Sequence, residues 1–304
     1  MTPNLFIVGA PKCGTSSLFD WLEKHPDIRG SRVKEPFFLT DPEHPLSRRP
    51  NLAHDGMVAY NEFFATEDTD APIRMEATTH YLFDPVAREV IASMADVRVI
   101  IVLREPAMRV YSSFQYTANN LARLSPGLTF ARYVALIEAG APLIPEWCSH
   151  EASAYVLQRD IGYSRYVQHV APWIAALGNG RVKILVMEEM VNNPDNTVLE
   201  LLKWLELDTG DIVPVDRAGR NRTEQVRMPR LQAIARRLNA RIRPPEPVRS
   251  LAKRTYGALQ FRGSRTMTTE DALALRRLQR SYVGDNASLA KISGLDLSSW
   301  QGAD

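Results

Sequence analysis

A glycine-bracketed loop near the N-terminus combines the residue types that bind an anion. An apolar strand ends before Gly9 and leads into a loop that holds one lysine. A helix then begins with hydroxyl residues up to Ser17. Backbone N–H groups in such a turn point inward, and the N-terminus of the helix adds partial positive charge. The candidate anion-binding residues are Lys12, Gly14, Thr15, Ser16 and Ser17.

The spacing of Gly9 and Gly14 imitates the loop that binds nucleoside triphosphates, in which a lysine follows the second glycine. Here Thr15 occupies that place and Lys12 lies inside the loop. In the triphosphate loop the hydroxyl residue after the lysine holds Mg²⁺, so this variant does not demand a metal, and we expect none. A degenerate triphosphate loop of a nucleoside or small-molecule kinase is an alternative, and so is a plain strand-to-helix turn with a serine cap.

Arg104 directly follows the apolar run Val97–Leu103. A charge at the end of a buried strand is costly unless it is paired, so Arg104 needs either an anionic ligand or an acid such as Glu105. Ser112 lies in the next predicted helix. The loop and Arg104 stand at the ends of two predicted parallel strands, where α/β proteins bind their ligands.

The elements that must position these residues alternate along the chain. Short apolar runs predict buried strands, and amphipathic stretches between them predict helices. Expected strands are Leu5–Val8, Ile73–Ala77, Val97–Leu103 and Val182–Met187; expected helices are Ser16–Lys24, Pro85–Met94, Ala107–Asn119, Arg165–Ala176, Thr197–Leu205, Thr269–Tyr282 and Asn286–Ile292. This alternation predicts an α/β fold with a central parallel sheet flanked by helices. We expect a single domain over residues 1–304, with Asp41–Asp70 as a long surface excursion.

The composition is that of an ordinary globular protein. The 304 residues include 37 Lys or Arg and 35 Asp or Glu, which excludes a disordered, collagenous or fibrous chain. The near-neutral net charge of +2 argues against a dedicated nucleic-acid binder. Arg217–Arg254 holds twelve basic and two acidic residues, but it lacks the interleaved aromatic residues of a nucleic-acid site and favours a solvated basic face.

Two cysteines, Cys13 and Cys148, cannot build a disulfide framework, and no CxxC or Cys/His cluster indicates zinc. The longest aliphatic run, Val99–Leu103, is far shorter than the roughly 20 residues of a membrane-spanning helix. The N-terminus has no basic segment before its apolar stretch. We therefore expect no transmembrane segment and a cytoplasmic location. The sequence indicates no oligomeric state.

The loop Gly9–Leu18 resembles the phosphosulfate-binding loop of sulfotransferases that use 3′-phosphoadenosine 5′-phosphosulfate (PAPS). The likeness is to the bacterial and carbohydrate (heparan-sulfate type) branch. Four further segments resemble that family in the same order, namely Lys34–Leu39, Glu76–Leu82, Leu103–Ser112 and the tail from Arg262 to Trp300. The resemblance implies a metal-free in-line transfer of the sulfuryl group from PAPS to a hydroxyl.

The resemblance also implies roles for individual residues. Lys12 would stabilise the leaving phosphate and the sulfuryl oxygens, while Gly14, Thr15, Ser16 and Ser17 would donate hydrogen bonds to the donor. Arg104 and Ser112 would bind its 3′-phosphate, and Arg262 and Gly263 would belong to a loop that closes over it. Glu35 would act as the general base, because the matching glutamate takes the acceptor proton in the carbohydrate branch. Lys34, Phe37 and His80 would face the substrate.

Two alternatives concern the base and the activity. His80 is by its chemistry a competing base near neutral pH, although its place in the family is variable. A catalytically inactive nucleotide-binding scaffold would keep the loop without transferring a group. The expected acceptor is a small molecule or a carbohydrate; Ala77 stands where several heparan-sulfate enzymes carry a lysine, which favours a small acceptor over a polymer.

Overall fold

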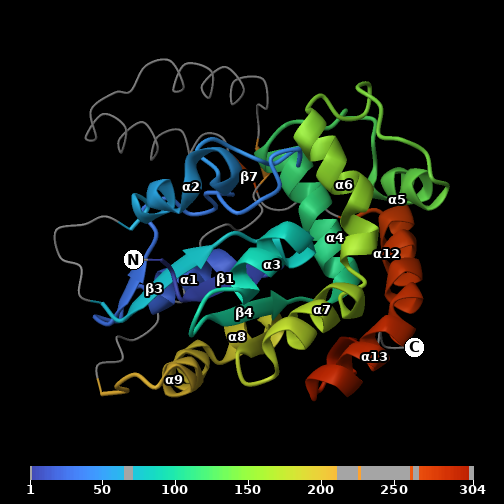
Figure 1. The fold of residues 1–304 in the computed structure, drawn as a ribbon. Coiled ribbons are helices and arrows are strands. Elements are labelled where there is room, and N and C mark those ends of the chain that lie inside the picture. Colours follow the sequence, from blue (N-terminus) through green and yellow to red (C-terminus); the bar gives the residue numbers. More distant parts are fainter. Residues whose placement is uncertain (1, 65–70, 211–224, 227–260, 263–266, 301–304) are drawn as a thin grey trace. The chain divides into compact units, whose positions relative to one another are not determined.

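A five-stranded parallel sheet forms the centre of the fold (Figure 1). The computed structural model describes residues 2–64, 71–210, 225–226, 261–262 and 267–300. The strands are β1 (Leu5–Gly9), β2 (Ile28–Gly30), β3 (Ile73–Ala77), β4 (Arg98–Leu103) and β5 (Val182–Val186), in the order β2-β3-β1-β4-β5. Neighbouring strands pair in parallel throughout this sheet. The predicted α/β fold with a central parallel sheet is confirmed.

Helices connect the strands and continue beyond them. They are α1 (Thr15–Leu22), α2 (Leu52–Asn61), η1 (Tyr81–Phe83), α3 (Pro85–Ala92), α4 (Pro106–Gln115), η2 (Tyr116–Asn120), α5 (Phe130–Glu138), α6 (Glu151–Tyr163), α7 (Val167–Leu177), α8 (Met187–Asn192), α9 (Pro194–Leu205), α12 (Thr269–Ser281), α13 (Val283–Ser293) and η3 (Ser298–Trp300). The strands β6 (Gln225–Val226) and β7 (Phe261–Arg262) pair antiparallel and form a second, two-stranded sheet.

The chain divides into two compact units. The first comprises Met1–Arg109, Gly162–Asn221 and Gln279–Asp304, and it contains the whole parallel sheet. The second comprises Val110–Ile161 and Arg222–Leu278. One domain over residues 1–304 remains a prediction.

The central strands are apolar on both faces because helices cover them, as is usual for parallel sheets. Every residue of β1 is buried, and so are Val99–Leu103 of β4. Trp173 of α7 and Trp300 of η3 are also buried in the core of this unit. The sheet is therefore a rigid platform, and the polar loops at its ends are the parts free to carry chemistry.

Several elements differ from the sequence-based expectations. The predicted excursion Asp41–Asp70 contains α2, which begins at an Asn51 cap and is interrupted at Gly56 (φ 67°). The short strand β2 was missed because three residues show no periodicity. Met187, expected to end a strand, instead begins α8. The helices α5 and α6 were not predicted either.

Candidate active site

The predicted anion loop lies between β1 and α1. Gly14 occupies the position before α1 with φ 80°, a left-handed conformation that glycine adopts without strain. A Cβ atom at Gly14 would lie 2.7 Å from Met190 Cε, the end of a flexible side chain that can move, so the left-handed φ is the main reason for glycine here. No side chain caps α1, which excludes the reading of the loop as a serine-capped turn.

Three predicted site residues share an unusual backbone conformation. Lys12 (φ 70°), Glu35 (φ 57°) and Phe37 (φ 56°) lie in the left-handed region, which few residues other than glycine occupy. Such conformations cost on the order of 1–3 kcal/mol each and concentrate at functional sites. Among the residues that the structure describes, six that are not glycine have a positive φ, and these three are half of them. Backbone strain is therefore found at several of the residues that the sequence predicts to be functional.

Arg104 follows β4 in the loop that leads into α4. Its carbonyl accepts a hydrogen bond from the Tyr166 hydroxyl (3.0 Å), and the same hydroxyl lies 3.9 Å from Cys13 Sγ in the anion loop. Tyr166 thus ties the loop after β1 to the end of β4. Burial raises the pKa of Cys13 to about 11, so its thiol is neutral and packs as a small buried side chain.

Glu105 is engaged elsewhere than at Arg104. Its carboxylate accepts hydrogen bonds from the backbone N–H groups of Ala107 (3.0 Å) and Met108 (2.7 Å), at the start of α4. Glu105 therefore acts as a helix cap, which is the usual use of an acid at that place. This arrangement supports an anionic ligand as the partner of Arg104.

Glu35 is held by hydrogen bonds on several sides. Its N–H donates to the Ala77 carbonyl (2.9 Å), and its carboxylate Oε1 accepts from the Thr79 hydroxyl (2.7 Å). The Lys34 ammonium lies 3.9 Å from the same Oε1, and Arg48 donates to the Glu35 carbonyl (3.2 Å). The Glu35 side chain is 34% exposed, so its carboxylate is fixed by Thr79 yet reachable from outside.

His80, the competing base, lies among aromatic rings. Its ring centroid is 6.1 Å from that of Phe37, 6.0 Å from that of Phe83 and 6.4 Å from that of Tyr163. Burial lowers the pKa of His80 to about 4, and its Nδ1 has no hydrogen-bond partner among the described residues. A histidine with that pKa accepts a proton no better than a carboxylate does, which favours Glu35 as the base.

A buried carboxyl that the sequence analysis left without a role lies at the end of β3. Glu76 is fully buried, and its carboxylate accepts hydrogen bonds from the Thr78 hydroxyl (2.6 Å) and from the Tyr60 hydroxyl. Burial raises the pKa of Glu76 to about 7, although these hydrogen bonds oppose the rise. The argument applied to Arg104 would have found it, because an acid inside a buried strand also needs partners.

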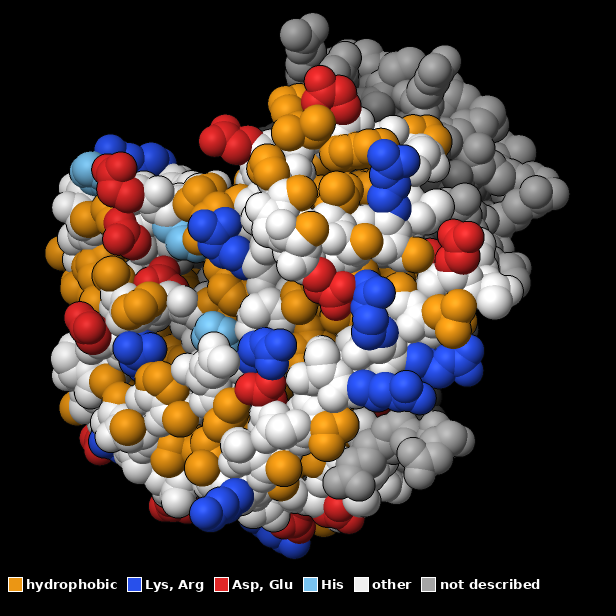
Figure 2. Space-filling model, turned by 90° about the vertical axis from the view of Figure 1, so that its right-hand side faces the viewer, with side chains coloured by type: hydrophobic (Ala, Val, Ile, Leu, Met, Phe, Trp, Pro, Cys, Tyr) orange, Lys and Arg blue, Asp and Glu red, His pale blue; other side chains and the backbone are white. Residues whose placement is uncertain are grey.

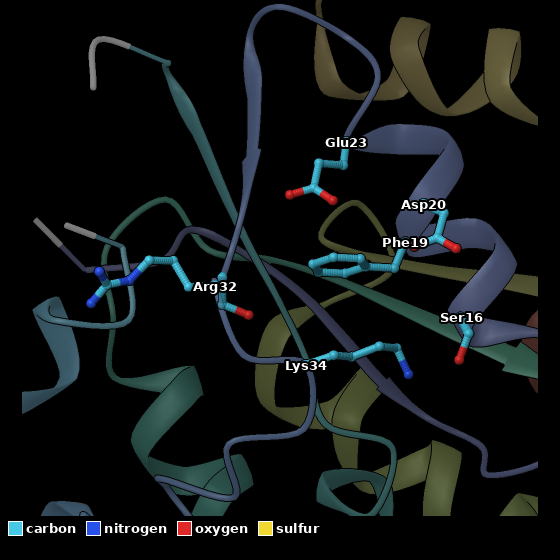
Figure 3. A pocket seen from close by; sticks show the side chains of 7 residues that line it. Ser16, Phe19, Asp20, Glu23, Arg32 and Lys34 are labelled. Atoms are coloured by element: carbon cyan, nitrogen blue, oxygen red, sulfur yellow. The ribbon is translucent and has the colours of Figure 1, made fainter. Parts of the chain in front are cut away.

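A pocket of about 420 Å³ lies between α1 and the segment from Ser31 to Lys34 that precedes Glu35. It is lined by Ser16, Phe19, Asp20, Glu23, Ser31, Arg32 and Lys34. Figure 3 shows the Lys34 side chain extending toward Ser16, with the Phe19 ring between Glu23 and Lys34 and the Arg32 side chain pointing away. Its size lies within the range of small-molecule sites.

All of the predicted site roles remain untested, and for three binding residues the structure gives only their place in the chain. Ser112 lies on α4 in the second compact unit, and Arg262 lies in β7. Gly263 lies outside the described residues, as does most of Arg217–Arg254. Their roles stay predictions. In Figure 2 the coloured basic side chains are interspersed with acidic and hydrophobic ones on the face shown.

The described part of the chain contains neither a membrane-spanning helix nor a cluster of metal ligands. No described helix has both the length and the apolar character to span a membrane. No group of three or more His, Cys, Asp or Glu side chains within residues 2–64, 71–210 and 267–300 is placed to hold a metal ion.

Known proteins share a domain and a fold with this chain. The profile of the sulfotransferase domain matches residues 2–224. A bifunctional heparan sulfate N-deacetylase/N-sulfotransferase 1 of Caenorhabditis briggsae is 27% identical over 214 residues, which are 67% of this chain and 23% of that protein. A heparan sulfate glucosamine 3-O-sulfotransferase 6 of Mus musculus is 25% identical over 206 residues, again 67% of this chain but 52% of that protein. The chain thus spans about half or less of the length of these two relatives.

The fold also matches a solved structure. A sulfotransferase from Alicyclobacillus acidocaldarius superposes with a TM-score of 0.68 over 99% of this chain and 100% of that one, at 22% identity. At this level of identity the likeness concerns the fold alone.

Proposed function

The chain belongs to the sulfotransferase domain family, and from that premise we propose that it transfers a sulfuryl group from PAPS to a hydroxyl of a carbohydrate or small-molecule acceptor. The observation that carries this proposal is a pocket lined from both sides of the proposed site. Ser16, in the first turn of α1 beside the anion loop, and Lys34, the neighbour of Glu35, line this pocket. A donor held at the start of α1 and an acceptor held near Glu35 would therefore lie close together.

The anion loop fits a phosphosulfate group. Gly14 at φ 80° leaves no Cβ in the cradle, and α1 begins with hydroxyl residues that do not cap it. Lys12 and the N–H groups at the start of α1 would hold the 5′-phosphosulfate, and Arg104 would hold the 3′-phosphate. PAPS supplies the activated sulfuryl group when bound.

The chain's own residues would stabilise the charge that develops in an in-line displacement. As the bond between sulfur and the bridging phosphate oxygen breaks, negative charge builds on that oxygen, and the Lys12 ammonium would offset it. Preorganised donors of this kind contribute about 10²–10³-fold in rate. The acceptor oxygen forms the new bond to sulfur, and its proton passes to the Glu35 carboxylate. Because Lys12 and Arg104 provide the positive charge, turnover is expected to persist in EDTA.

The acceptor is proposed from the pocket and from the relatives. The printed names of the two relatives concern heparan sulfate, which supports a sugar hydroxyl. A pocket of about 420 Å³ and Ala77 in place of a lysine favour one sugar or a molecule of similar size over a polymer. A cytoplasmic location stays a prediction.

A thermal-shift comparison tests the donor site. The product nucleotide, 3′-phosphoadenosine 5′-phosphate (PAP), is expected to raise the melting temperature without Mg²⁺. Lys12→Ala and Arg104→Ala are expected to lose most of that rise, whereas Lys24→Ala, an exposed lysine after α1, keeps it. Stabilisation by ATP only with Mg²⁺ would instead indicate a kinase.

A turnover assay tests the base. PAP release from PAPS is measured with glucosamine, heparan sulfate and 4-methylumbelliferone as acceptor probes. Glu35→Gln is expected to retain the PAP-induced melting shift and to lose about 10²–10⁴-fold in turnover. PAP binding without transfer to any probe would favour the inactive scaffold, and undiminished turnover by Glu35→Gln would remove the base assignment.

A further inference from the structure

Two carboxylates, one reachable and one buried, are held by consecutive threonines. The Thr79 hydroxyl donates to Glu35 Oε1 (2.7 Å), and the Thr78 hydroxyl donates to Glu76 Oε1 (2.6 Å). Glu35 is 34% exposed, whereas Glu76 is fully buried. Paired carboxyl groups in different environments are a common basis for dividing acid–base roles.

Glu76 lies at the centre of the structure that fixes the Glu35 segment. The Tyr60 hydroxyl of α2 donates to Glu76, and the Tyr60 ring stacks on Phe38 at 4.6 Å. The Tyr81 hydroxyl accepts from the N–H of Leu39 (3.0 Å), so β3 and η1 hold both ends of the segment from Glu35 to Leu39. Fixing this segment stabilises the left-handed conformations of Glu35 and Phe37.

We propose that Glu76 is a positioning residue for Glu35: its buried carboxylate, held by Tyr60 and Thr78, anchors the segment that carries Glu35. This inference rests on the proposed role of Glu35 as the base. Its physical reason is that an ionised carboxylate accepts stronger hydrogen bonds than a protonated one, so the anchor is firmest when Glu76 is charged.

The groups that face Glu76 come from three other segments and from its own. They are Tyr60 from α2, Tyr81 from η1, Glu35 from the segment after β2, and Thr78 beside Glu76 itself. Around Glu35 lie the charged side chains of Lys34 and Arg48 and the titratable ring of His80. Burial raises the pKa of Glu76 to about 7, the hydrogen bonds from Thr78, Tyr60 and Tyr81 lower it, and the charge of Glu35 raises it further.

The anchoring role predicts a measurable step in the pH dependence. As pH rises through about 7, Glu76 ionises and its hydrogen bonds with Thr78 and Tyr60 strengthen, so Glu35 is held more firmly and kcat/KM is expected to rise. Glu76→Gln should remove this step and lower kcat/KM about three- to tenfold at pH 8, with little change at pH 6.

The deciding experiment follows Glu76 itself and needs no acceptor. Protein labelled with ¹³C at the glutamate side-chain carboxyls is titrated by NMR, with the Glu76 signal assigned from its loss in Glu76→Gln. We expect a midpoint near pH 7 in the wild type and a lower midpoint in Glu35→Gln. Tyr60→Phe, which removes one hydrogen bond to the carboxylate, should move the midpoint upward and gives a second test if Glu76→Gln does not fold.

The outcomes separate this inference from the proposed function. A Glu76 midpoint at the ordinary value of a glutamate, or one that does not respond to Glu35→Gln, would overturn this inference even if sulfuryl transfer is observed. Failure of PAP to bind the wild type would instead count against the donor site. Glu89→Gln, a change of an exposed glutamate on α3, is the matched control and should leave the Glu76 midpoint unchanged.

Discussion

Gly9→Ala places one added methyl group at the point where β1 meets η1. A Cβ atom at Gly9 would lie 2.6 Å from Leu82 Cβ, 2.8 Å from Leu82 Cδ2 and 3.1 Å from the Thr79 carbonyl oxygen. Leu82 Cβ is attached directly to the backbone, so a rotamer change cannot relieve this contact. Overpacking of a core costs about 1–3 kcal/mol, and a rigid contact places this variant near 2–3 kcal/mol.

The assay is a melting curve with and without PAP. At about 2–4 °C per kcal/mol, Gly9→Ala should melt about 4–12 °C below the wild type. Because Thr79 donates to Glu35, displacement of its backbone should also lower turnover. The control is Gly162→Ala near the end of α6, where no atom lies within 4 Å of the added Cβ. That variant should be unchanged or more stable by about 0.5–1 kcal/mol. A Gly9→Ala protein as stable as Gly162→Ala would refute the close packing of β1 on η1.

Three further outcomes follow from the same contacts. Tyr166→Phe leaves the Arg104 carbonyl without its 3.0 Å donor, so the free energy of unfolding should fall by about 1–3 kcal/mol and PAP affinity should weaken, as measured by urea denaturation and thermal shift. Because the pKa of His80 is lowered to about 4, folding disfavours its protonation, so stability is full above pH 6.5 and is lost as pH falls through about 4. His80→Gln should therefore lose less stability than the wild type over that range, and equal acid sensitivity of the two proteins would contradict this. Burial raises the pKa values of Cys13 and Cys148, so neither should react with iodoacetamide at pH 8 until denaturant is added; labelling of the native protein, seen by mass spectrometry, would show that they are accessible.

The strands of the sheet could be expected from the sequence because their signals are local. The run Val97–Leu103 is apolar without interruption, as a doubly covered strand must be, and β4 spans Arg98–Leu103. Ile73–Ala77 was predicted from a weaker pattern, and β3 has the same bounds. By contrast β2, at the edge of the sheet, exists because β3 offers it partners across Ile28–Gly30. A strand of three residues is too short to show the alternation of apolar and polar residues by which strands are recognised in a sequence.

The candidate site divides in the same way. The anion loop was recognisable because Gly9, Lys12 and Gly14 lie within one short segment. The Glu76 cluster was not, since Tyr60, Thr78 and Glu76 meet only when α2 packs beside β3. The sequence places Glu76 inside a predicted strand, where an acid needs partners, but it does not show which residues those partners are.

The sequence by itself determined where four of the five strands lie along the chain, the glycine positions of the anion loop and the residue types available for the proposed sulfuryl transfer. These depend on backbone sterics and local apolar patterns, which act between near neighbours in the chain. Only the tertiary structure decided which carboxyl is buried, which threonine holds Glu35 and where Tyr166 joins the two strand ends. Desolvation and hydrogen bonding between distant segments set these properties, and both arise only after the chain has folded.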